Sequence, residues 1–388
     1  MRKERGGWSK AASRSDAGGE YSLVRTDGWT CVREPVSEAL HPASTQRLLV
    51  WRSPPSRALV LKKPGEELMP DVRNVVHFLE RFLSVEVVAE RPVAQRLAED
   101  GYGSVQELCR VDTDPEHPVV ALTVCVGGDG VILHASKLFS GKCPPVLAFS
   151  LGSLGFLASH PIENFEKILR SCTRARGGGS FVTMRMRLTC EVIRAGKSRP
   201  NESEIFSVLN EAVVSRGTSP YLSMIECYEQ GRLITKVQAD GVILSTPTGS
   251  TAYSAAAGGS MVHPSVPGIL FTPICPHTLS FRPVVLPDSS ELELRIPQDA
   301  RSSAWAFFDG SQRRALEHGD KIRVRRSDHP MPTFSQVDQT GDWLSSLYRC
   351  LSWNDRIEQK AMQPSVSLDA VEEESEQETV GSNHTEPR

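Results

Sequence analysis

The sequence predicts an α/β nucleotide-binding domain followed by a C-terminal antiparallel domain of the β-sandwich type. Three observations lead to this fold class. Apolar runs typical of buried strands alternate with helical spacing up to about residue 176. One run ends in Gly127-Gly128-Asp129-Gly130, a turn suited to the ligand-binding edge of an open α/β sheet. Beyond Gly177, strand patterns follow one another with few helices between them.

The first domain is expected to contain a parallel sheet. A helix begins at Pro70, because apolar residues follow it at spacings of three and four, and a second helix covers 131–139. Strands and helices that alternate in this way favour right-handed crossovers. The expected strands are Ala58–Leu61, Val85–Val88, Val119–Val126 and Pro145–Phe149.

The second domain is expected to be largely antiparallel. Gln230-Gly231 is typical of a hairpin turn between two of its strands. Near the end of the chain, Trp343, Leu344 and Leu347 return to helical spacing. The expected strands are Phe181–Ile193, Ile205–Ser215, Tyr221–Tyr228, Leu233–Gln238, His277–Val285, Glu291–Ile296, Trp305–Phe308 and Lys321–Val324.

These patterns divide the chain into five ranges. A flexible leader without sustained periodicity covers 1–45, the α/β domain 46–176 and the β-rich domain 177–330. The segment 331–362 holds the last helix and is expected to pack back on the α/β domain. The tail 363–388 is acidic and polar, so it cannot bury enough apolar surface to fold.

Composition excludes several classes of protein. The 388 residues suffice for two domains with cores, and a net charge of −3 gives no reason to expect nucleic acid or an anionic membrane as partner. No apolar run approaches the ~20 residues that span a bilayer. Nine scattered cysteines without a Cys-x-x-Cys pair indicate reduced thiols and no zinc site. We expect a cytoplasmic protein, with organellar targeting by the leader left open.

Asp129 is the candidate catalytic residue. The glycines around it let a backbone approach phosphate closely and supply N–H donors. The carboxylate itself would repel phosphate, so it is better suited to hold a metal or to accept a hydroxyl proton during phosphoryl transfer. A tight turn with a solvated aspartate is the alternative that the turn alone leaves open.

Two further segments offer groups that recognise nucleotides. Asn210-Glu211 ends an apolar run, and its amide and carboxylate could bind a ribose diol or an adenine amino group, or simply form a strand edge. Asp240-Gly241 precedes an apolar strand that leads into Thr248-Gly249-Ser250-Thr251-Ala252-Tyr253-Ser254. That turn is either an ordinary helix cap or an anion site, and the small residues up to Ser260 favour a large polar ligand.

Other features carry less weight. Asp309-Gly310 is explained at least as well by a hairpin turn as by a site, and His263 and His277 lack metal-ligand spacing. The chain has no P-loop and no Gly-x-Gly-x-x-Gly after a strand, which disfavours P-loop enzymes and Rossmann dehydrogenases.

Together these residues resemble the NAD kinases, ATP-dependent enzymes that phosphorylate the adenosine 2′-hydroxyl of NAD. The resemblance runs from about Arg52 to Met362 and includes features of the eukaryotic branch. It rests on the motifs above and on Lys62-Lys63, Leu151-Gly152-Ser153-Leu154-Gly155-Phe156-Leu157, Pro273-Ile274-Cys275-Pro276-His277, Arg282-Pro283 and Arg349-Cys350-Leu351-Ser352-Trp353-Asn354. It implies an NAD kinase/diacylglycerol kinase-like fold with the site between the two domains.

The resemblance also implies roles for individual residues. Asp129 would accept the proton of the 2′-hydroxyl, with Gly128 and Gly130 against the nucleotide. Asn210 and Glu211 would hold a ribose, and Asp240 another hydroxyl of the dinucleotide. Thr248, Thr251, Ala252, Tyr253 and Ser254 would line the adenine and ribose pocket. No protein metal site is expected, because ATP would bring Mg²⁺ bound mainly by phosphates and water.

Some alternatives stay open. A lipid or sugar-phosphate kinase would share the Gly-Gly-Asp-Gly turn, but the Asn-Glu pair and the Thr-Gly-Ser-Thr-Ala-Tyr run argue against it. A non-catalytic NAD sensor is also conceivable, because Val131 stands where the family usually has Thr; Ala239 in place of Gly carries little weight. We further expect a homo-oligomer, a dimer or tetramer.

Overall fold

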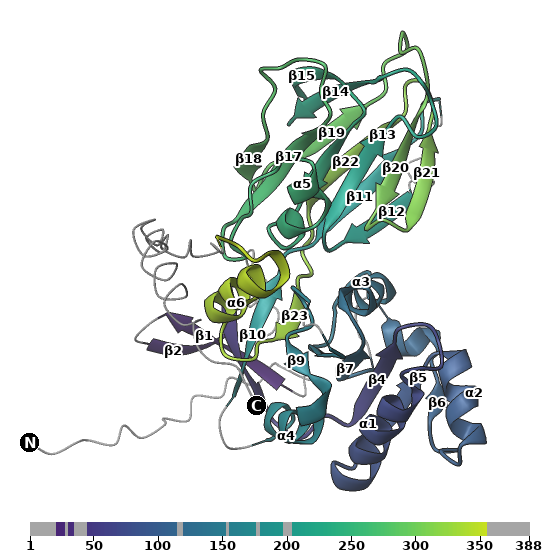
Figure 1. Cartoon of the computed structure of the whole chain (residues 1–388), viewed down its shortest axis with the longest axis vertical. Helices are drawn as coiled ribbons and strands as arrows, with labels where there is room; N and C mark the ends of the chain where they lie inside the picture. Colours follow the sequence, from purple (N-terminus) through teal and green to yellow (C-terminus); the bar gives the residue numbers. More distant parts are fainter. Residues whose placement is uncertain are drawn as a thin grey trace, which may run out of the picture.

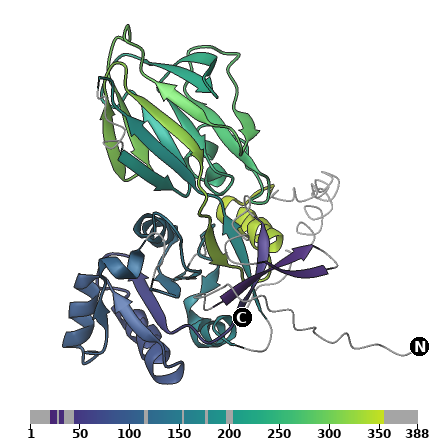
Figure 2. The same ribbon diagram turned by 180° about the vertical axis from the view of Figure 1, so that it is seen from behind.

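The computed structural model describes residues 21–27, 30–34, 45–114, 119–152, 155–175, 179–196 and 204–354. They form an α/β domain and, beside it, a domain of two stacked antiparallel sheets (Figures 1 and 2). This arrangement confirms the predicted fold class. No helix in the described ranges is long and apolar enough to cross a bilayer.

The α/β domain is built on one mixed sheet. Its order is β2-β1-β3-β10-β23-β8-β7-β4-β5-β6, with β9 paired to β8, and all pairs from β23 to β6 are parallel. The strands are β1 (Tyr21–Asp27), β2 (Thr30–Glu34), β3 (Gln46–Trp51), β4 (Arg57–Lys62), β5 (Glu86–Ala89), β6 (Gln106–Glu107), β7 (Leu122–Val126), β8 (Val146–Ser150), β9 (His160–Pro161), β10 (Ser180–Arg185) and β23 (Met331–Phe334).

Helices cover this sheet with their apolar faces. In α1 (Met69–Phe82), a proline at the first turn starts the helix, and the buried residues recur at the spacing expected from the sequence. The other helices are α2 (Arg91–Glu99), α3 (Asp129–Leu138), α4 (Phe165–Cys172) and α6 (Gln339–Leu351), with 3-10 turns at Arg110–Thr113 and Ile162–Asn164.

The β-rich domain is a sandwich. One sheet has the order β12-β11-β22-β19-β14-β15, and the other β18-β17-β16-β13-β20-β21. Their inner faces share one apolar core, in which Phe206 and Phe308 stack at 4.1 Å. The strands are β11 (Leu188–Ile193), β12 (Glu204–Val208), β13 (Glu211–Ser215), β14 (Ser223–Glu229), β15 (Arg232–Ala239), β16 (Gly241–Ser245), β17 (Gly268–Ile274), β18 (Val284–Pro287), β19 (Leu292–Arg295), β20 (Ala304–Phe308), β21 (Gln312–Leu316) and β22 (Lys321–Arg326).

Three expected elements differ from the structure. The run Phe181–Ile193 forms two strands in different domains, because β10 pairs with β3 and β23 in the first sheet. The run Ile205–Ser215 also divides, into β12 and β13 of opposite sheets. Within the expected leader, β1 and β2 form strands on the edge of the first sheet. The rest of that leader and the acidic tail lie outside the described residues.

Arg187 lies where the chain passes between the domains, and its side chain is fully buried. It donates from Nε to the His329 carbonyl at 2.7 Å and from Nη1 to the Ser136 carbonyl at 3.2 Å, and it also contacts the Phe139 and Gly141 carbonyls. Burial lowers the pKa of this guanidinium. Its donors therefore satisfy carbonyls at the end of α3 and join them to the β-rich domain.

We expect Arg187→Met to lower the free energy of unfolding by about 3–5 kcal/mol, because the buried carbonyls of Ser136, Phe139 and Gly141 lose the donors that Arg187 supplies. Denaturant unfolding of the variant measures this change. Arg325→Met is the matched control: Arg325 is exposed, pairs with Asp328 at 3.6 Å and donates weakly to the Arg326 carbonyl, so we expect a change under about 1 kcal/mol. Equal effects of the two substitutions would contradict the role of Arg187.

Candidate active site

The glycine turn joins β7 to α3 at the carboxyl edge of the first sheet. Gly127 has a φ of +142°, and a Cβ there would lie 2.9 Å from Val131 Cγ2. Only glycine fits this position. A Cβ at Gly128 or Gly130 would meet nothing within 4 Å, so these two backbone positions face open space.

Asp129 is the first residue of α3, and its carboxylate binds backbone of a separate segment. Oδ2 accepts from the Phe156 N–H at 3.0 Å, and Oδ1 accepts from the N–H groups of Leu157 at 3.1 Å and Ala158 at 3.0 Å. A carboxylate has about four acceptor positions. These bonds leave one position, on Oδ2, for a further donor.

Gly155 makes this contact possible, a role that the sequence reasoning did not assign. A Cβ on Gly155 would lie 2.1 Å from Asp129 Oδ1. Any side chain would therefore push the carboxylate away from the three N–H donors. Its signal in the sequence was the Leu-Gly-Ser-Leu-Gly-Phe-Leu motif, which indicated a family and not a contact.

Asp309 fixes the backbone of the Asn210-Glu211 pair. Its carboxylate accepts from the backbone N–H groups of Leu209 at 2.9 Å, Asn210 at 2.8 Å and Glu211 at 3.2 Å. Asp309 and Gly310 both have positive φ, and the Ser311 N–H donates to the Phe308 carbonyl, as in a type I′ turn. The predicted hairpin is confirmed, and its aspartate also positions the candidate ligand-binding pair.

Glu211 is buried beside this second acid. Its Oε2 has no hydrogen-bond partner within the described part of the chain. Burial, and then the charge of Asp309, raise the pKa of Glu211 to about 7. An unpaired acceptor in a buried place is costly to the fold, and a hydroxyl donor from a ligand would satisfy it.

Asp240 and Tyr253 lie on the same side of the β-rich domain. Asp240 Oδ1 accepts from Arg216 Nε at 2.6 Å and is half-exposed. Burial raises the pKa of Tyr253, and the nearby charges of Cys275, Asp240 and Glu211 add to this shift. Tyr253 therefore lies close to both acids, with part of its ring open to solvent.

The segment Thr248–Ser254 forms a 3-10 turn (Thr248–Thr251) and the short helix α5 (Tyr253–Ala256). Thr248 is buried and its Oγ1 has no partner in the described structure, while Thr251 Oγ1 donates to the Thr248 carbonyl at 3.3 Å. Ala252 is half-buried. Ser254 is fully buried, and its hydroxyl is hydrogen-bonded to Thr272 Oγ1 at 2.9 Å, so its predicted place in the ligand pocket stays a prediction.

The structure brings the glycine turn and the Asn-Glu pair together across the domain boundary. Leu209 shares an apolar cluster with Val131 and Ala158. Lys137 of α3 donates to the Asp309 carbonyl at 3.4 Å and contacts Ser311 Oγ. Val131 packs inside that cluster, so its apolar side chain belongs to the support beneath the turn.

Arg185 is a further charged residue next to this junction that the sequence did not single out. Burial lowers its pKa to about 10, and the charges of Asp129 and Asp342 oppose this shift. Its Nε donates to Thr333 Oγ1 at 2.9 Å. It lines a hollow of about 20 Å³ together with Phe156 and Asp342. This volume suits a water molecule and not a nucleotide.

Across the described residues, no three His, Cys, Asp or Glu side chains converge in a metal site. A hard cation takes oxygen ligands, and phosphate oxygens and water can supply most of them.

Comparison with known proteins links this geometry to a family. The ATP-NAD kinase N-terminal domain matches residues 58–176, and the ATP-NAD kinase C-terminal domain matches residues 209–335. NAD kinase 2, chloroplastic, of Arabidopsis thaliana is 55% identical over 350 residues, which are 88% of this chain and 35% of that protein. A probable NAD kinase 2, chloroplastic, of Oryza sativa gives the same identity over 349 residues. The chain thus spans about a third of the length of these plant relatives.

A solved structure agrees with these matches. A yeast NADH kinase complexed with NADH superposes with a TM-score of 0.72 at 31% identity, covering 82% of this chain and 94% of the yeast chain. An NAD kinase from Archaeoglobus fulgidus in complex with ATP shares the fold with a TM-score of 0.56. The chain belongs to the NAD kinase family, in its eukaryotic branch.

Proposed function

We propose that this chain transfers the γ-phosphoryl group of ATP to the adenosine 2′-hydroxyl of NAD, giving NADP and ADP. Family membership supports the reaction type. The observation that carries the proposal is the Asp129 carboxylate, held by three backbone N–H groups with one acceptor position left, at a turn in which Gly128 and Gly130 face open space.

Asp129 would accept the hydroxyl proton. A hydroxyl is a far weaker acid than a carboxylic acid, so the proton moves late, as the bond from the 2′-oxygen to phosphorus develops. The three N–H donors hold the carboxylate in place, and its remaining Oδ2 position orients the nucleophile. Positioning of this kind is the main task in phosphoryl transfer, which needs little covalent chemistry from the protein.

The β-rich domain would hold the dinucleotide. The unpaired Oε2 of Glu211 would accept from a ribose hydroxyl, and Asn210 offers an amide donor and acceptor beside it. Asp240 would accept from another hydroxyl, and Thr248, Thr251, Ala252 and the exposed part of Tyr253 would lie along the adenosine. Mg²⁺, bound to the phosphates of ATP, would neutralise part of their charge.

Incubation of the purified chain with ATP, Mg²⁺ and NAD, followed by an assay for NADP, tests the proposal. NADP formation supports it. NAD binding without NADP would instead favour the sensor that Val131 suggested.

We expect Asp129→Asn to lower kcat by about 10²–10⁴-fold, because an amide cannot accept the proton and its NH2 group cannot replace a carboxylate oxygen that accepts from the Phe156–Ala158 N–H groups. The fold and NAD binding should persist, as measured by circular dichroism and titration calorimetry. A rate near that of the wild type would remove Asp129 from this role.

We expect Gly130→Ala to weaken substrate binding without lowering the stability of the free protein. A Cβ at Gly130 meets no atom within 4 Å, and alanine favours a helix, so we expect unchanged or slightly raised thermal stability. If a nucleotide lies against this backbone, KM for NAD or ATP should rise about tenfold or more. Unchanged KM values would place both substrates elsewhere. Gly103→Ala, with equally open space far from the turn, is the control.

The pKa of Glu211 predicts how NAD binding depends on pH. The carboxylate must be ionised to accept two hydroxyl bonds, and its pKa of about 7 lies above the ordinary value of 4.5. As pH rises from about 6 to 8, the ionised fraction grows roughly tenfold, so KM for NAD should fall by a similar factor. In Glu211→Gln we expect a higher KM without this dependence. An equally steep pH profile in the variant would assign the titration to another group.

A further inference from the structure

A second hollow lies at the opposite end of the α/β sheet from Asp129. It has a volume of about 720 Å³, within the range of about 300–1,000 Å³ that small-ligand sites occupy. Pro54 and Val85 at its wall precede the amino ends of β4 and β5, whereas the glycine turn follows a carboxyl end. It is therefore separate from the proposed active site.

Two arginines line this hollow without an acidic partner. Arg170 is in the last turn of α4. Arg174 is four residues further along the chain and lies just beyond the end of that helix. Among the described residues, neither guanidinium has a hydrogen bond or ion pair, and no Asp or Glu lines the hollow. The hollow therefore carries positive charge with no acidic group on its wall, which favours an anionic ligand.

Aromatic rings fix Arg170 in position. Its guanidinium carbon lies 4.8 Å from the centroid of Phe78 and 5.7 Å from that of Phe82. Stacking over a ring uses the face of the guanidinium plane and leaves its N–H donors in that plane free. Arg170 is thus a preformed fork of the kind that binds phosphate oxygens in pairs.

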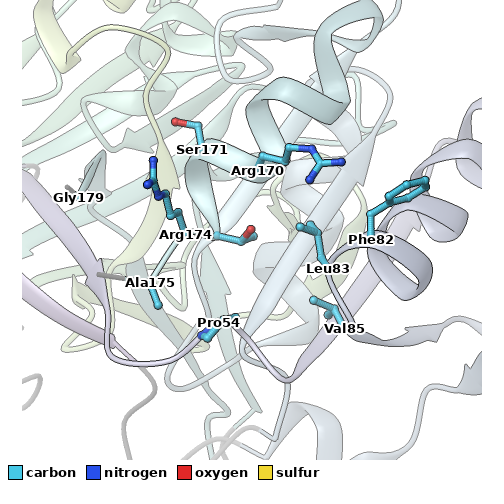
Figure 3. Close-up of a pocket in the computed structure, with 10 residues that line it drawn as sticks. Pro54, Phe82, Leu83, Val85, Arg170, Ser171, Arg174, Ala175 and Gly179 are labelled. Atoms are coloured by element: carbon cyan, nitrogen blue, oxygen red, sulfur yellow. The ribbon is translucent and has the colours of Figure 1, made fainter. Parts of the chain in front are cut away.

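Phe82 gives the hollow an apolar side. Its side chain is 57% exposed, although it ends a helix whose other apolar residues are mostly buried. Figure 3 shows Arg170 next to Phe82 and Leu83 on one side of the hollow, Arg174 and Ala175 on the other, and Pro54 and Val85 across from them. A cationic side thus adjoins a surface for a flat ring.

A purely structural role of the two arginines explains less of this arrangement than ligand binding does. Cations near the C-terminus of α4 are favoured by the helix dipole, which accounts for one arginine in the last turn. It does not account for two unpaired guanidinium groups on one hollow beside an exposed ring.

We propose that this hollow binds a small ligand in which a phosphate group is joined to a flat ring, as in a nucleoside monophosphate. Arg170 binds the phosphate oxygens, Arg174 adds positive charge from the opposite side of the hollow, and the ring lies against Phe82 and Leu83.

Calorimetric titration of AMP into the full chain tests this site. Binding in the active-site cleft is common to all variants, so the difference between variants isolates the hollow. We expect the wild type to bind AMP at a second site besides the active site. In Arg170→Gln/Arg174→Gln the Kd of that second site should rise at least about tenfold, because charge-assisted hydrogen bonds are lost. NADP formation by the same variants reports on the active site separately.

Arg81→Gln/Lys167→Gln is the matched control, because it removes the same charge from α1 and α4 outside the hollow. Unchanged AMP binding in this control supports a specific site, and an equal loss in both double variants overturns it. Inorganic phosphate should bind more weakly than AMP, and Phe82→Ala should abolish that difference. AMP binding that is identical in the wild type and the Arg170→Gln/Arg174→Gln variant contradicts the proposal.

Discussion

The active-site geometry depends on one carboxylate that collects three backbone N–H groups. Asp129 begins α3 and binds Phe156, Leu157 and Ala158, which follow the neighbouring strand β8. The two loops that leave adjacent parallel strands are thereby held together at the sheet edge. Gly155 allows this approach because it has no side chain, and Gly127 allows the turn itself. The same bonds that order the loops leave one acceptor position on Oδ2, so folding and the proposed chemistry use one group.

A second constraint is the connection between the domains. Arg187 binds carbonyls of both, and Lys137 of α3 reaches the turn that holds Asn210 and Glu211. Leu209 packs in the cluster beneath the glycine turn. These contacts hold together the two halves of the proposed site, which come from different domains. Burial raises the pKa of both Glu211 and Asp309, the charge of Asp309 adds to the shift of Glu211, and Glu211 Oε2 has no hydrogen-bond partner among the described residues. Such an arrangement is unfavourable for the empty protein and favourable for a ligand that donates hydroxyl groups.

Much of the fold followed from the sequence. The spacing of Val72, Val75 and Val76 predicted α1, and the apolar run before Gly127 predicted β7. The division of Phe181–Ile193 between two sheets could not be predicted, because alternation shows that a residue is in a strand but not which strands pair with it. For the same reason β10 was assigned to the wrong domain.

For the candidate site, too, the sequence predicted residue types and motifs but not the contacts between distant segments. Residue type and motif order identified Asp129, Asn210 and Glu211, but no local pattern distinguishes a solvated acid from one that binds distant backbone. The partners of Asp129, the role of Gly155 and the turn held by Asp309 depend on contacts between segments far apart in the chain. Ser254 is part of a motif typical of ligand binding, yet its hydroxyl is hydrogen-bonded to Thr272 on β17. Arg170 and Arg174 form no motif, since only the fold places them around one hollow.

A crystal structure of the chain with NAD and a non-hydrolysable ATP analogue tests the central claim most directly. The account predicts the adenosine 2′-oxygen within about 2.6–3.2 Å of Asp129 Oδ2, with the Phe156–Ala158 N–H bonds intact and the γ-phosphate on the far side of that oxygen. A 2′-oxygen bound away from Asp129, or a carboxylate that leaves the three N–H groups when substrates bind, would contradict it.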